Sequence, residues 1–282
     1  MARPGRLVAA LAVLLMTPLA ACDSPPAGGE PVRSAPPVVP APTPGDPPTL
    51  PLGRHAGWKL TFSGEFEGTS LDMSRWLDRS SAEPDEGRGN PDNEQLEWNQ
   101  AANCRVGGGQ LMLTAKREQV TSPSSGQRYE WTSCLVTTRR ADAFQYGYLE
   151  ERSILPAPRG FWPAFWTWQA GGVDLHTETD VYEFYSDNHQ RFYSTQHSGA
   201  QGRCDWRPSF DPTTGWHTYG VAIEPSGTTW YADGVQVCHT AATSDGKTNI
   251  ISNLAVYAKI PPAESTSEAT KRVDYIRAWS AP

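Results

Sequence analysis

Apolar and polar residues alternate along several short stretches of this 282-residue chain, whereas long helical periodicity is missing. A period of two residues is typical of a strand with one buried face. A strong hairpin signal is the dipeptide Asp233-Gly234, because type I′ turns need positive φ. The pattern therefore predicts strands, and the clearest runs cover residues 110–116, 147–152, 217–223, 228–237 and 273–279.

Many short strands separated by turn residues indicate a sandwich or a barrel. The strand pattern begins near Trp58, so we expect one folded domain over residues 57–282. About 225 residues suffice for a core between two sheets. No internal repeat is visible in the chain. The expected fold class is therefore all-β.

The N-terminus has the features of an export signal. Arg3 and Arg6 precede a short apolar run over residues 7–16, which is too short to span a bilayer. Residues 19–22, Leu-Ala-Ala-Cys, resemble the bacterial lipobox. That resemblance implies a signal peptide over residues 1–21, a lipid on Cys22 and an exported lipoprotein anchored at the cell surface. Plain secretion is the alternative.

A proline-rich segment follows the signal. Residues 25–51 contain eleven prolines among Ala, Gly, Ser and Thr. Such a segment has too little apolar surface to pack, and proline favours extended polyproline II structure. We therefore expect residues 22–56 to be a disordered linker between the lipid and the domain.

Four cysteines remain when Cys22 carries a lipid: Cys104, Cys134, Cys204 and Cys238. An even number outside the cytoplasm suggests two disulfides, with three ways to pair them. The pairs 104–134 and 204–238 are favoured, because each would join segments that could be neighbouring strands. Free buried thiols are the alternative, and the spacing does not resemble a zinc site.

The composition narrows the choice of ligands. The formal net charge is −7 and no run of Lys or Arg is present, so we expect no nucleic-acid partner. Eleven Trp and ten Tyr are many for this length. Most must pack in the core, but aromatic faces also bind sugars, and the count favours a carbohydrate ligand. We expect a monomer.

The acidic segment over residues 178–185 suggests chemistry. It places Glu178, Asp180 and Glu183 within six residues of an otherwise apolar and aromatic strand. Buried unpaired carboxylates are costly, so a stable fold would place them in a wet cleft or pair them. On a regular strand Glu183 would point away from the other two acids. One bulge would bring all three to the same face.

Three acids on one face suit retaining glycoside hydrolysis, in which two carboxyl groups flank the glycosidic bond at ~5–5.5 Å. Glu178 would attack the anomeric carbon, and Glu183 would protonate the leaving oxygen and later activate water. Asp180, between them, would hydrogen-bond Glu178 and tune the pKa values of both. A calcium cluster or a solvated edge strand are the alternatives.

The spacing Glu-x-Asp-x-x-Glu resembles the signature of glycoside hydrolase family 16, in the bulged form of laminarinases and agarases. Four further segments occur in the family's order and also resemble its motifs. These segments cover residues 93–98, 144–152, 160–168 and 273–277, so that the resemblance extends over roughly residues 58–282.

The resemblance implies a β-jelly-roll, a sandwich of two bent antiparallel sheets with a concave substrate cleft crossed by the acidic strand. It implies Glu178 as nucleophile, Asp180 as assisting acid and Glu183 as acid/base. It also suggests further residues for binding sugar, with a structural role as the alternative for each: Asn93, Arg152, Trp162, Trp166 and His197. Trp162 and Trp166 should share a face, because they are four residues apart.

No cofactor is expected for the chemistry, but the family often binds a structural calcium ion. Matching positions here are Glu65 and Asp274, whose oxygen atoms suit Ca²⁺. Many relatives read Asp-Glu-Phe where this chain has Gly64-Glu65-Phe66. A surface salt bridge is therefore the alternative for these two acids.

The expected activity is endo-acting hydrolysis of a polysaccharide, with β-1,3- or β-1,3(4)-glucan as the default substrate. Val181-Tyr182 and the loop over residues 198–206 differ from familiar laminarinases, and this leaves the specificity open. A transglycosylase would use the same site with a sugar hydroxyl in place of water. A lectin-like binding module is the third hypothesis, although it has no need of paired glutamates.

Overall fold

The structure, a computed structural model, describes residues 50–52, 57–170, 176–198 and 202–281. The expected signal peptide, Cys22 and most of the expected linker lie outside these described residues. Within them, no helix has both the length and the apolar character needed to cross a bilayer. The helices that are present are 3₁₀ helices of three residues each: η1 (Pro91–Asn93), η2 (Ala101–Asn103) and η3 (Arg140–Asp142).

The first of two large sheets, the cleft sheet, has seven strands and antiparallel pairing throughout. Its order is β14 (Gly202–Trp206), β13 (Phe192–Gln196), β12 (Glu178–Glu183), β11 (Phe161–Gln169), β18 (Thr248–Val256), β9 (Leu135–Thr138) and β2 (Trp76–Leu77).

The second sheet, the outer sheet, has ten strands. Its path is β17 (Val235–Thr240), β16 (Gly227–Ala232), β15 (His217–Glu224), β10 (Gly147–Ile154), β19 (Glu268–Ser280), β5 (Leu111–Lys116), β8 (Trp131–Ser133) and β3 (Glu97–Asn99). Off this path, β1 (Lys59–Gly64) pairs with β19 and β4 (Cys104–Val106) with β5. The pair β3–β8 is parallel, and β6 (Val120–Thr121) with β7 (Arg128–Tyr129) forms a separate small ribbon.

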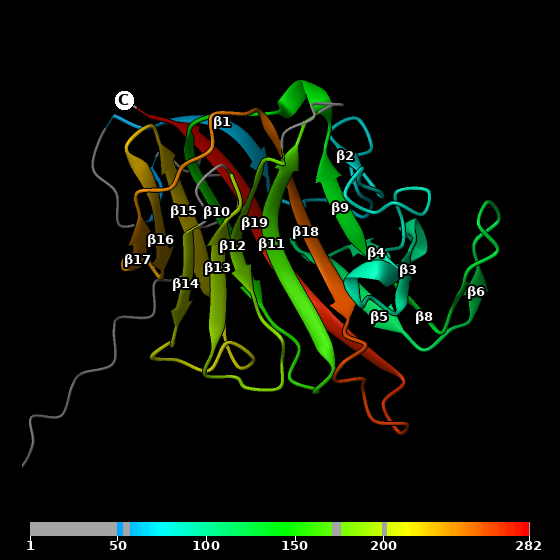
Figure 1. The fold of residues 1–282 in the computed structure, drawn as a ribbon. Helices are drawn as coiled ribbons and strands as arrows, with labels where there is room; N and C mark the ends of the chain where they lie inside the picture. The colour runs from blue at the N-terminus through cyan, green and yellow to red at the C-terminus, as the bar shows by residue number, and fades with distance from the viewer. Residues whose placement is uncertain (1–49, 53–56, 171–175, 199–201, 282) are drawn as a thin grey trace, which may run out of the picture. The chain divides into compact units, whose positions relative to one another are not determined.

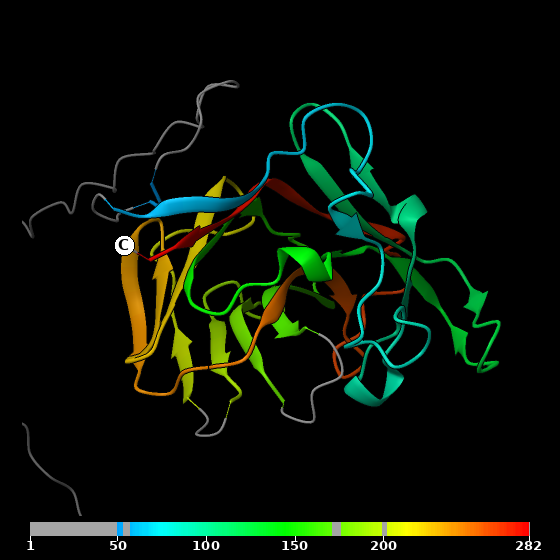
Figure 2. The same cartoon turned by 90° about the horizontal axis from the view of Figure 1, so that it is seen from above.

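The two sheets pack face to face and form a β-jelly-roll sandwich, as the sequence predicts (Figures 1 and 2). In Figure 1, β19 of the outer sheet runs behind β11, β12 and β18 of the cleft sheet. Strand β5 shows how the pattern builds the core, because Leu111, Leu113 and Ala115 are fully buried while the residues between them are not. Alternate side chains of a strand point to opposite faces of its sheet.

The hairpin prediction is confirmed. Strands β16 and β17 pair across the turn at Asp233-Gly234, where Ala232 lies opposite Val235. Asp233 has φ 47° and Gly234 has φ 76°. Positive φ at both central residues is what a type I′ turn requires.

Both favoured disulfides are present, Cys104–Cys134 and Cys204–Cys238. The second joins β14 at the edge of the cleft sheet to β17 at the edge of the outer sheet. It therefore closes one side of the sandwich. Cross-links of this kind stabilise mainly by restricting the unfolded chain.

A segment that precedes the expected domain contacts the outer sheet. Residues 50–52 fall in the expected linker, yet Pro51 is buried and the Leu52 amide donates a hydrogen bond to Glu150 Oε2 at 2.9 Å. Glu150 belongs to the outer sheet. A proline-rich composition concealed this contact, which depends on a residue 98 positions away.

Candidate active site

The expected bulge is present in β12, and it puts the three acids on one face. Asp180 lies opposite Trp166 of β11, whereas Tyr182 lies opposite Phe165. Two neighbouring residues of β11 thus face two residues of β12 that are two apart, and Val181 is the extra residue. Glu183, opposite Ala164, is brought back to the face of Asp180 by this shift.

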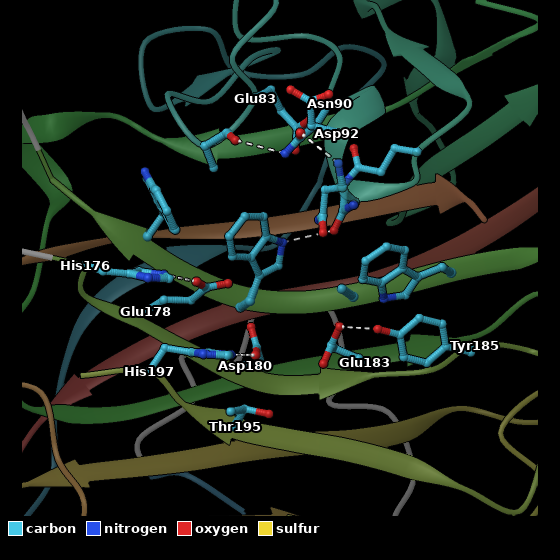
Figure 3. Close-up of a pocket in the computed structure, with 18 of the residues that line it drawn as sticks. Glu83, Asn90, Asp92, His176, Glu178, Asp180, Glu183, Tyr185, Thr195 and His197 are labelled. Atoms are coloured by element: carbon cyan, nitrogen blue, oxygen red, sulfur yellow. Dashed lines mark hydrogen bonds and ion pairs between the residues drawn. The ribbon is translucent and has the colours of Figure 1, made fainter. Parts of the chain in front are cut away.

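This face forms the floor of a cleft of about 650 Å³. All three acids line it (Figure 3). Of the other residues that the sequence suggested for sugar binding, Asn93, Trp162, Trp166 and His197 line it too. Asn93 comes from η1, and the tryptophans come from β11. One concave surface therefore gathers seven of the eight candidate catalytic and substrate-binding residues.

Hydrogen bonds orient each of the three acids. His197 Nε2 lies 3.0 Å from Asp180 Oδ2, and His176 Nε2 contacts Glu178 Oε2. The two imidazole rings are stacked, with centroids 5.6 Å apart and planes 6° apart. On the other side the Tyr185 hydroxyl donates to Glu183 Oε1 at 2.8 Å. Figure 3 shows these contacts along the cleft floor.

Burial and the repulsion of neighbouring negative charges make Glu178 and Glu183 hold protons more tightly. Burial, followed by the negative charges of Asp180 and Glu183, raises the pKa of Glu178 to about 10. Burial and the charge of Asp180 raise the pKa of Glu183 to about 8. Interacting carboxyl groups lose protons as a set rather than one by one. A carboxyl group that stays protonated near neutral pH is available as a general acid.

The histidines respond differently to the same charges. The hydrogen bond with Asp180 is the main cause that raises the pKa of His197. Burial and the nearby charge of His197 lower the pKa of His176. A cationic His197 next to Asp180 compensates part of the negative charge of the cluster.

Aromatic side chains of β11 cover the cleft floor beside the acids. Trp162 stacks on Tyr185 with ring centroids 4.7 Å apart and is nearly buried. Trp166 and Trp168 are more exposed, and Trp166 Nε1 donates to Asn253 Oδ1 at 3.0 Å. Flat apolar faces next to carboxyl groups suit the apolar faces and the hydroxyls of a sugar chain. The expectation that Trp162 and Trp166 share a face is confirmed.

Arg152 was expected at the cleft, and this is wrong. It lies on β10 of the outer sheet, where Glu151 points between the sheets and Arg152 points outward. Its Nη1 lies 2.6 Å from Asp274 Oδ2. Because the cleft is on the other sheet, neither face of β10 could present a side chain to it.

The residues expected to bind calcium do not fit a shared site. Both oxygens of Glu65 accept hydrogen bonds from Arg277, at 2.8 and 2.7 Å. Asp274 pairs instead with Arg152. Each carboxylate thus has a guanidinium partner that neutralises its charge, which is the salt-bridge alternative.

One group of side chains in the described part of the chain has ligand atoms close enough for a metal ion. Atoms of Glu178, Asp180 and His197 lie within 4.8 Å of one another. The hydrogen bond between His197 and Asp180 brings two of these three ligand atoms together.

Sequence reasoning missed several residues of the cleft: Glu83, Asp92, Trp168, His176, Tyr185, Arg203 and Asn253. Alternation could have found three of them. His176 and Tyr185 each stand two residues from a glutamate on the cleft face. Trp168 continues the series 162, 164, 166 along β11 in the same way. The others come from other loops and strands.

The chain resembles known proteins in sequence. The model of the family "Glycosyl hydrolases family 16" matches residues 91–277. An endo-1,3-1,4-beta-glycanase, EglC, of Rhizobium meliloti is 29% identical over 239 residues, covering 78% of this chain and 51% of that protein. A glucan endo-1,3-beta-glucosidase of Cryptopygus antarcticus is 29% identical over 262 residues, covering 80% and 93%. The chain thus spans only about half the length of the first relative.

It also resembles solved structures. The catalytic domain of an endo-1,3-beta-glucanase (laminarinase) from Thermotoga petrophila has a TM-score of 0.71 and 25% identity, covering 80% of this chain and 98% of that one. An endo-beta-1,3-glucanase from Pyrococcus furiosus gives the same TM-score with 26% identity, covering 80% and 95%.

Proposed function

Since the chain belongs to glycosyl hydrolases family 16, we propose that it is a retaining, endo-acting hydrolase of β-1,3- or β-1,3(4)-linked glucan. The observation that carries this proposal is the bulge at Val181, which gives Glu178 and Glu183 the same face of the cleft. The relatives support the substrate class, because they are named as an endo-1,3-1,4-beta-glycanase and a glucan endo-1,3-beta-glucosidase.

In the first step Glu178 attacks the anomeric carbon from one side. Glu183 donates its proton to the glycosidic oxygen, so that the leaving sugar departs with a hydroxyl and a glycosyl ester remains on Glu178. The raised pKa of Glu183, about 8, keeps that proton available near neutral pH. The Tyr185 hydroxyl holds the Glu183 carboxyl in place.

In the second step Glu183, now ionised, takes a proton from a water molecule. The resulting hydroxide attacks the anomeric carbon and releases Glu178 as a carboxylate. Two displacements at one carbon retain its configuration. In a transglycosylase a sugar hydroxyl would take the place of the water.

Glu178 must be ionised to attack, and its own raised pKa opposes this. In this mechanism Asp180 removes the difficulty, because its carboxyl lies beside that of Glu178 and would take up the proton when Glu178 attacks. When the proton is on Asp180, Glu178 bears the charge. His197 contacts the other side of Asp180 and fixes its orientation.

Replacing Tyr185 with phenylalanine should shift the pH dependence of catalysis. Burial and Asp180 raise the pKa of Glu183, while the bond from Tyr185 lowers it. Without the hydroxyl the pKa of Glu183 rises further, so its acid form persists to higher pH. The alkaline limb of kcat/KM against pH should therefore move to higher pH. An unchanged or downward-shifted limb would contradict the role of Glu183 as the acid.

The proposal is tested by release of reducing sugar from a panel of laminarin, lichenan, agarose, carrageenan, xyloglucan and β-galactan. We expect laminarin or lichenan to be cut into short oligosaccharides. Hydrolysis only shortens chains, so products longer than the substrate would indicate a transglycosylase. Binding to a glucan without any cleavage would instead favour a lectin-like module.

We further propose that the enzyme is exported and held at the membrane by a lipid on Cys22. The two disulfides support an oxidising compartment. Mass spectrometry of the mature N-terminus tests this directly. A lipid-modified cysteine is expected as the first residue. An unmodified N-terminus would contradict lipid anchoring and indicate plain secretion.

A further inference from the structure

A buried ion pair lies behind the catalytic strand, between the two sheets. Lys271 of β19 and Glu151 of β10 have no exposed side-chain surface, and Lys271 Nζ lies 3.1 Å from Glu151 Oε1. Neither residue lines the cleft or takes part in the proposed chemistry. Resting on that proposed function, we propose that this ion pair, acting through Tyr182, fixes the register of the bulge and so the placement of the two catalytic glutamates.

The pair is tied to three strands of the cleft sheet. The Tyr182 hydroxyl of β12 donates to Glu151 Oε1 at 2.7 Å. The Ser252 hydroxyl of β18 donates to Glu151 Oε2 at 2.6 Å. Lys271 Nζ donates to the Ala164 carbonyl of β11 and to Ser252 Oγ, both at 2.8 Å.

These attachments all lie at the level of the bulge. Tyr182 directly follows Val181, the extra residue. Ala164 is the residue opposite Glu183, and Phe165, next to it, pairs with both Tyr182 and Ser252. The ion pair therefore holds the bulged strand and its partner strand at the point where their register changes.

A bulge needs such a fixed point, because a one-residue slip moves every side chain to the other face. If the extra residue moved along the strand, an apolar side chain such as Val181 would take the place of Tyr182. Glu151 would then lose a hydrogen bond in a fully buried site, which is unfavourable. The hydroxyl of Tyr182 thus distinguishes the active register from its neighbours.

Stability alone does not account for this ion pair. Replacing a buried ion pair by apolar residues of similar volume is often neutral or stabilising, because both charges must lose their water. Specifying one arrangement among several is a role that such pairs serve in other proteins. This pair lies behind the part of β12 that carries Asp180 and Glu183. Fixing the register of β12 there also fixes the positions of the catalytic carboxyl groups. Tyr182, Glu151 and Lys271 are therefore positioning residues.

The test is Tyr182→Phe, which cuts the link to the bulge while leaving the ion pair its bonds to Ser252 and Ala164. We expect kcat on the best glucan to fall by roughly tenfold to a hundredfold, because small misplacements of catalytic groups are costly. KM should change by less than about twofold, since the cleft surface is intact. Hydrogen exchange of the β12 amides should become faster.

Tyr219→Phe is the matched control. The Tyr219 ring packs on that of Tyr182 with centroids 4.6 Å apart, and its buried hydroxyl has no hydrogen-bond partner among the residues that the structure describes. This variant removes the same atom from the same part of the core without touching the ion pair. We expect kcat, KM and exchange of the β12 amides to match the wild type.

A Tyr182→Phe enzyme with wild-type kcat and wild-type exchange would overturn the proposal. Equal losses in both variants would also overturn it, because general packing would then be the cause. A second variant, Glu151→Leu with Lys271→Met, removes both charges together and should also lower kcat with little change in KM. If the wild type cleaves no glucan, the proposed function fails, and exchange at β12 still decides whether the ion pair fixes the register.

Discussion

Replacing Glu178 with alanine should reduce turnover of the glucan substrate by at least about a thousandfold, while binding of the polysaccharide stays within a few-fold of the wild type. The side chain is the proposed nucleophile, so its loss removes an interaction made only as the reaction proceeds. A thousandfold loss corresponds to about 4 kcal/mol of transition-state stabilisation. Initial rates and a binding assay on the same polymer measure the two effects separately.

Adding a small nucleophilic anion to the Glu178→Ala enzyme tests the role of Glu178 as nucleophile more specifically. Azide can enter the space left by the Glu178 side chain and attack the anomeric carbon with Glu183 still in place. We expect it to restore cleavage, and to give a glycosyl azide of inverted configuration. Glu130→Gln serves as the control, because Glu130 is exposed and pairs with Arg128 far along the chain from β12. An active Glu178→Ala enzyme would contradict the account.

Replacing Glu183 with glutamine should slow hydrolysis of the glucan by roughly 10²- to 10⁴-fold, the usual contribution of general acid–base catalysis. The size of the effect should depend on the leaving group. An aryl glycoside whose phenol leaves without protonation needs no acid in the first step. It should therefore give a burst of phenol, followed by slow release of the sugar, because the second step still lacks its base.

The burst of phenol distinguishes the role of Glu183 from that of Glu178. Stopped-flow measurement of phenol release should show it for Glu183→Gln but not for Glu178→Ala, which cannot form the glycosyl ester. Equal losses on the polymer and on the activated substrate would contradict an acid/base role. They would point instead to a binding role for Glu183.

The sequence predicted the central feature of the site because that feature is local. An odd spacing between Glu178 and Glu183 is incompatible with one face of a regular strand, so a cleft with both acids required a bulge. The structure contains that bulge at Val181. The turn at Asp233-Gly234 was predictable for a similar reason, since few residues accept positive φ.

Features that depend on distant pairing were not predictable. Arg152 matches the last residue of a family motif. The sheet that its strand joins is set by partner strands far along the chain, so the motif alone could not show on which sheet Arg152 lies. Tyr182 attracted attention in the sequence only because Val181-Tyr182 differs from familiar laminarinases. Its hydrogen bond to Glu151 joins residues that are 31 positions apart, so no local pattern indicates it. Glu65 and Asp274 likewise each pair with an arginine from a distant part of the chain. The sequence could therefore name calcium and, as its alternative, a surface salt bridge, but not the partner of either acid.

The proposed function rests on double displacement by Glu178 and Glu183 at one glycosidic bond. The most direct measurement is proton NMR of the first reducing ends released from laminarin or lichenan, recorded before mutarotation equilibrates them. The account predicts that the β-anomer appears first and the α-anomer only later. Initial appearance of the α-anomer would mean inversion, and would contradict the role of Glu178 as the nucleophile.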